Sequence, residues 1–138
     1  MFPNLTSIQN EPDSYGNTVP CCRSMFYNCT SLVSIDDLFP VLQEANIAEG
    51  YSPFVDMFYG CTSLQSLPNT LFSSAAFSNI KFDNTFQLCS SLTEVQEVFP
   101  PDSSNNSLYY AFASSGLTKV PKINGTNHNL DAAFSDCK

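Results

Sequence analysis

The sequence predicts an α/β fold, a solenoid whose coils each contain one short parallel strand and one short helix. An apolar set at spacing i, i+3, i+4, i+7 occurs five times, and a leucine follows four of the sets at a nearly fixed distance. Self-similarity at a period of about 20 to 50 residues is typical of solenoids, in which each unit buries its apolar face against its neighbours. Successive repeat phenylalanines are 32, 28, 26 and 22 residues apart: Phe26, Phe58, Phe86, Phe112 and Phe134.

Each apolar set predicts a helix, because residues at this spacing lie on one stripe of a helix with ~3.6 residues per turn. Ser52-Pro53 is a helix-start pair, and Asp83, Asn106 and Asn129 are expected to cap later helices. A helix of about two turns is not stable alone, so packing between coils must order it. The sets are Cys22/Met25/Phe26/Cys29, Phe54/Met57/Phe58/Cys61, Phe82/Thr85/Phe86/Cys89, Leu108/Ala111/Phe112/Ser115 and Leu130/Ala133/Phe134/Cys137.

The segment after each apolar set predicts a short parallel strand. These segments are rich in Ser and Thr, and Leu5-Thr6-Ser7-Ile8 fits the same pattern. A second helix is expected between residues 36 and 50, where the repeat is longest. The predicted inward positions are Leu32, Leu64, Leu92 and Leu117, then Ile35, Leu67, Val95 and Val120, and a third column at Phe39, Phe72 and Phe99.

Length and charge restrict the class of protein. The 138 residues predict a single repeat domain, 1-138, with about four full repeats and partial repeats at both ends. A net charge of −8 and a pI near 4.2 disfavour nucleic acid and anionic membranes as partners. No apolar run approaches the ~18 residues of a membrane span, so no membrane insertion is expected. The first residues lack a signal-peptide pattern, so either a longer precursor carries the signal or the chain is not exported by that route.

Six cysteines raise the question of a disulfide framework. Cys29, Cys61, Cys89 and Cys137 occupy one repeat position, and Cys22 stands in an apolar position. Free cysteine behaves as a small buried hydrophobe, so a buried ladder of free thiols is the preferred interpretation. Bridges between coils, or a strained Cys21-Cys22 disulfide, are the alternatives.

Catalytic and metal-binding patterns are weak. The thiols are spread one per repeat, which is not the close spacing of zinc ligands, and Asp36-Asp37 lacks further carboxylates at calcium-loop spacing. His128 lies in the polar run Asn-Gly-Thr-Asn-His-Asn and is expected to be solvated. No Gly-x-Ser-x-Gly or Gly-rich phosphate loop is present. The chain is therefore predicted not to be an enzyme, with no cofactor and no metal.

Two strings carry a resemblance to a known family. Met25-Phe-Tyr-Asn-Cys-Thr-Ser-Leu32 and Met57-Phe-Tyr-Gly-Cys-Thr-Ser-Leu64 resemble the BspA-type leucine-rich repeats of bacterial, protist and phage surface proteins, and residues 85–92 are a looser copy. The resemblance implies a leucine-rich-repeat-type solenoid that binds other macromolecules at a cell surface or outside the cell. It implies no catalytic residue.

Two functions are therefore expected. The first is a non-enzymatic binding or adhesion module for a protein or glycan ligand, using outward strand positions Ser7, Ser34, Gln65, Ser66, Thr93, Glu94 and Lys119. The second is a structural repeat segment of a virion, fibre or surface assembly. The chain starts just before a predicted strand and stops after a predicted helix. It is therefore expected either to be part of a longer array or to make end-to-end contact with another repeat segment, and the alternative is that its end coils fray.

Overall fold

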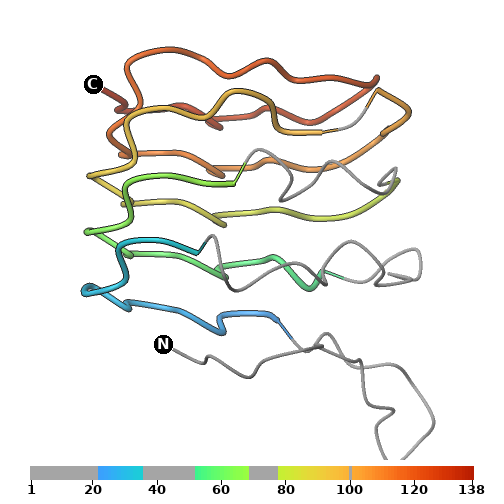
Figure 1. Ribbon diagram of the computed structural model, residues 1–138. Helices are drawn as coiled ribbons and strands as arrows, with labels where there is room; N and C mark the ends of the chain where they lie inside the picture. Colours follow the sequence, from blue (N-terminus) through green and yellow to red (C-terminus); the bar gives the residue numbers. More distant parts are fainter. Residues whose placement is uncertain (1–21, 36–51, 69–77, 100) are drawn as a thin grey trace, which may run out of the picture.

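The chain forms a stack of coils that follow one another in sequence order, as Figure 1 shows from the blue to the red end. The computed structural model describes residues 22–35, 52–68, 78–99 and 101–138. The strand expected at Leu5-Ile8, the helix expected between residues 36 and 50, and the positions Phe39 and Phe72 lie outside the described residues.

The predicted α/β solenoid with a helix and a strand in every coil is wrong. Within the described ranges there is no α-helix, and strand pairing is confined to isolated parallel bridges between neighbouring coils. These bridges are Ser78 to Ser104, Lys81 to Ser107, Glu97 to Lys122, Ser104 to Thr126 and Ser107 to Asn129. In the same part of the chain, no helix is long and apolar enough to cross a membrane.

Each predicted helix is instead a run of overlapping β-turns, which we call a turn segment. The turn segments are residues 22–29, 54–61, 82–89, 108–115 and 130–137. In the third of them, Thr85 N–H donates to Phe82 O, Gln87 N–H to Asn84 O and Cys89 N–H to Phe86 O. These bonds span three residues and occur at every second residue, whereas an α-helix bonds every N–H to the carbonyl four residues earlier. The expected capping roles therefore do not apply.

Left-handed residues at fixed positions prevent helix formation. The third and seventh residues of every turn segment have φ between 52° and 70°. A left-handed residue ends an α-helix but suits the third position of a type II turn. These residues are Ser24, Asn28, Asp56, Gly60, Asn84, Leu88, Tyr110, Ser114, Ala132 and Asp136. Asn, Asp and Gly adopt this conformation most readily, which explains their frequency here.

The remaining backbone N–H groups join one coil to the next. Asn84 N–H donates to Tyr109 O at 2.9 Å, and Phe86 N–H donates to Ala111 O at 2.8 Å. The same pairing links the other neighbouring turn segments. Alternate N–H groups thus close turns within a coil and bridge to the following coil. Because half of the bonds cross between coils, a turn segment depends on its neighbours for order.

The repeat phenylalanines form one continuous column of stacked rings. Their centroids lie 5.3 to 5.5 Å apart, from Phe26 through Phe58, Phe86 and Phe112 to Phe134. The repeat phase predicted from the sequence is therefore confirmed, although the expected helix is not. The i, i+3, i+4, i+7 set is buried in the second coil, where Phe54, Met57, Phe58 and Cys61 are at most 1 % exposed.

The cysteines support the same column. All of the described cysteines are free thiols. The Cys61 thiol donates to Phe26 O at 3.1 Å, and the Cys89 thiol donates to Phe58 O at 3.2 Å, each one coil back. Cys22 is buried, as predicted for a residue in an apolar position, but Cys29 is exposed and Cys137 is half-buried. The buried ladder is therefore shorter than the sequence predicted.

Candidate binding surface

The residues after each turn segment form an exposed strip, which we call the outer face. It consists of the pairs Val33-Ser34, Gln65-Ser66, Thr93-Glu94 and Thr118-Lys119, all of them exposed. A leucine precedes each pair, and Leu64, Leu92 and Leu117 are buried. In three coils this leucine closes a turn on the cysteine three residues earlier, at 3.0 Å in each: Leu32 N–H donates to Cys29 O, Leu64 N–H to Cys61 O and Leu92 N–H to Cys89 O. The turn segment therefore fixes which two residues project outward.

Hydrogen bonds between coils place these pairs next to one another. Gln65 N–H donates to Val33 O at 3.1 Å, and Thr118 N–H donates to Thr93 O at 3.4 Å. The outer face lacks the continuous ladder of a parallel sheet, because these contacts are sparse. The pairs are held mainly by the turn segments that precede them.

The structure brings together six of the predicted site residues. Ser34, Gln65, Ser66, Thr93, Glu94 and Lys119 are on the outer face, whereas Ser7 lies outside the described residues. The face offers hydroxyl, amide and backbone groups, with Glu94 and Lys119 as its charged side chains. A surface of this kind suits hydrogen bonding to a polar ligand.

One neighbouring prediction is wrong. The sequence predicts that Val120 points inward, at the same repeat position as Ile35. In the structure Val120 is 69 % exposed, and the next residue, Pro121, is buried. The leucine of this coil comes one residue earlier after its phenylalanine than in the other coils. This shortening shifts the residue that points inward.

A tyrosine pair on the turn segments was not among the predicted site residues. The rings of Tyr27 and Tyr59 stack at 4.7 Å with an interplanar angle of 2°, and Tyr27 is 47 % exposed. Both follow the repeat phenylalanine directly, in the strings Met-Phe-Tyr. Their shared repeat position was the signal for this contact, since equivalent positions stack in register.

His128 is held in place and is not the solvated loop residue that the sequence predicted. Its Nδ1 accepts a hydrogen bond from Asn106 N–H at 3.1 Å, and its Nε2 lies 2.9 Å from Asn124 O, to which it donates. The imidazole also packs against the Phe99 ring, with the two ring centroids 4.9 Å apart. Both ring nitrogens therefore bind backbone groups, so this histidine has a structural part.

The buried thiols are poorly suited to nucleophilic chemistry. Burial raises the pKa of Cys61 to about 11 and that of Cys89 to about 12. Such thiols stay protonated near neutral pH, and the thiolate is the reactive form. Among the residues that the structure describes, no three His, Cys, Asp or Glu side chains are grouped as a metal site.

Comparison with known proteins gives no relative from which a function could be transferred. The chain matches no family model, and no curated protein or solved structure is significantly similar to it.

Proposed function

We propose that this chain is a non-enzymatic binding or adhesion module whose outer face contacts a protein or glycan ligand. The observation that supports this most directly is the alignment of exposed, mostly polar pairs from successive coils. A repeated strip of hydroxyl and amide groups on a stacked core can make many weak hydrogen bonds to one extended ligand. The resemblance to BspA-type surface repeats favours the same function and a location at the cell surface or outside the cell, or on a virion.

The test is a ligand screen with two variants of equal charge change. The outer-face variant is Ser34→Ala/Ser66→Ala/Glu94→Ala. The control, Lys81→Ala/Asp102→Ala/Asp131→Ala, changes exposed residues elsewhere and shifts the net charge by the same amount. Binding to extracellular matrix proteins and to a glycan array is compared. Loss of binding by the first variant alone supports the proposal, and equal binding by both variants refutes the assignment of this face.

A second candidate function is end-to-end assembly, and the last turn segment favours it. In the earlier coils the left-handed residues and the repeat phenylalanine donate their N–H groups to the next coil. The equivalent N–H groups of Ala132, Phe134 and Asp136 have no acceptor among the described residues. Phe134 is half-buried, with one ring face stacked on Phe112. An edge that is unpaired within the described residues is a template for further pairing.

We propose as this alternative that a second copy of the chain stacks on that edge. The test is light scattering over a concentration series. Leu130→Lys places a charge at the first residue of the last turn segment, beside this edge, where the side chain is 44 % exposed. The control, Val120→Lys, places a charge at an exposed residue directly after the outer face. Association that Leu130→Lys abolishes and Val120→Lys preserves supports stacking, whereas a monomer at every concentration excludes it.

A further inference from the structure

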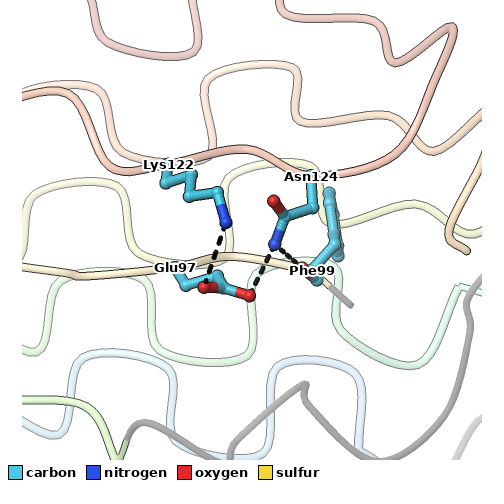
Figure 2. A network of polar contacts seen from close by, with 4 residues as sticks. All are labelled: Glu97, Phe99, Lys122 and Asn124. Carbon is cyan, nitrogen blue, oxygen red and sulfur yellow. Dashed lines mark hydrogen bonds and ion pairs between the residues drawn. The ribbon is translucent and has the colours of Figure 1, made fainter. Parts of the chain in front are cut away.

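Asn124 and Gly125 form a corner where segments from different coils are joined. The Asn124 side-chain Nδ2 donates to Glu97 Oε1 at 2.5 Å and to Phe99 O at 2.6 Å, both one coil back (Figure 2). Lys122 Nζ lies 3.7 Å from Glu97 Oε2, on the other oxygen of the same carboxylate. Both hydrogens of the Asn124 amide are thus engaged.

Gly125 is required at this corner. Its φ of +93° is outside the range that L side chains usually adopt, and a Cβ there would collide with Ser103 O and crowd His128 Nε2 at 2.7 Å. The backbone on both sides is fixed, because Thr126 N–H donates to Ser103 O at 3.1 Å and His128 Nε2 donates to Asn124 O. The chain therefore needs glycine after Asn124 for steric reasons.

An Asn-Gly pair has an intrinsic chemical weakness. Glycine has no side chain to shield its nitrogen and allows wide backbone rotation. The Gly125 nitrogen can attack Asn124 Cγ, forming an N–C bond, while the bond from Cγ to Nδ2 breaks and ammonia leaves. Water then opens the resulting succinimide to an aspartate or isoaspartate. The sequence contains Asn-Gly only here.

We propose that Asn124 is a deamidation site that the folded corner protects, and that its reaction releases the corner irreversibly. The leaving nitrogen is held by two acceptors, so the folded state opposes both its departure and the rotation that the attack requires. The product carboxylate has no hydrogen to donate. It would face the Glu97 carboxylate and the Phe99 carbonyl, two acceptors, with repulsion between like charges.

The first test measures deamidation by peptide mapping of the full chain during incubation. We expect slow reaction in the native protein and much faster reaction in denaturant. Glu97→Ala removes one acceptor and should speed the native reaction several-fold. Lys122→Ala removes the ion pair and leaves both Asn124 bonds, so its rate should match that of the unmodified protein. Equal rates in the native and denatured chains would overturn the proposed protection.

The second test mimics the product. Asn124→Asp should lower the thermal unfolding midpoint and increase hydrogen exchange at residues 97–99 and 124–128. Adding Glu97→Gln supplies a side-chain amide that can donate to the new carboxylate, and should recover most of the midpoint. An Asn124→Asp variant that unfolds like the unmodified protein would overturn the proposed release, and a double variant as unstable as the single one would refute the repulsion.

Discussion

The third and the fifth turn segments, residues 82–89 and 130–137, adopt the same conformation in different surroundings. Both have left-handed residues at their third and seventh positions and bonds across three residues. In the third segment, Phe86 is stacked on both ring faces and is 1 % exposed. In the fifth, Phe134 has one stacked neighbour and is half-buried. The local conformation is thus shared, while the packing that stabilises it differs.

This difference indicates where the stability of the coil stack originates. A turn segment closes its own turns whether or not a following coil covers it. Burial of its ring and its bonds to the next coil add further stability. Within the described residues, the fifth segment receives bonds from the fourth segment but donates none to a following coil. Substitutions at equivalent positions of the two segments should therefore have unequal effects.

The largest expected effect is at the stacked ring. Phe86→Ala should lower the free energy of unfolding by about 3–5 kcal/mol, because it leaves a cavity between two coils that cannot close. Phe134→Ala should cost clearly less, since only one of its ring faces is stacked within the described part of the chain. Urea denaturation of both variants checks this. Equal losses would show that the fifth segment is as well covered as the third.

The second effect concerns a left-handed glycine. Gly60→Ala should cost at least about 1–2 kcal/mol for the left-handed conformation alone. Its φ is +70°, and the added Cβ would also collide with the Asn28 side chain of the neighbouring coil. Asp136→Ala, at the equivalent position of the fifth segment, already has a Cβ and should change stability little. If both variants unfold at the same denaturant concentration, both the left-handed penalty at Gly60 and the clash with Asn28 are contradicted.

A third effect is loss of stability at alkaline pH. The folded pKa of Cys61 is raised to about 11 and that of Cys89 to about 12, from an ordinary value of 9.0. A raised thiol pKa gives stability that is complete below pH 9 and is lost as pH rises through the folded pKa values. Stability should therefore fall between pH 9 and about 12. Tyrosines also titrate in this range, and they remain in the Cys61→Ser/Cys89→Ser variant. The stability of this variant should fall less steeply between pH 9 and about 12, and the difference is the contribution of the two thiols.

The packing of the side chains could be predicted from the sequence better than the conformation of the backbone could. The repeat phase, the buried phenylalanines and the outer position of Ser34, Ser66 and Glu94 followed from apolar spacing alone, because burial depends on which residues recur. A spacing of i, i+3, i+4, i+7 is shared by a helix and by overlapping turns, so it could not distinguish them. The distinguishing signal was present at the left-handed positions, in Asn28, Gly60 and Asn84.

Other features depended on contacts that the sequence pattern does not contain. The two hydrogen bonds of His128 come from Asn106 and Asn124 in different coils, and no local motif marks them. The exposure of Val120 follows from a one-residue shortening, which shifts the inward position. Repeat spacing predicts equivalent positions only where the segment length is constant.

The smallest expected effect is a change in the free energy of unfolding whose sign distinguishes a turn segment from a helix. Leu88 has φ of +62° and is 39 % exposed, so Leu88→Gly removes left-handed strain, which offsets the loss of the covered part of the side chain. We expect it to be neutral or to stabilise by up to about 1 kcal/mol. In an exposed helix the same change would destabilise by about 1 kcal/mol. Gln87→Gly, at a residue without positive φ, is the matched control and should destabilise by roughly 0.5–1 kcal/mol. A loss at Leu88 as large as that at Gln87 would contradict the left-handed turn, and the third segment would then have to be helical in solution.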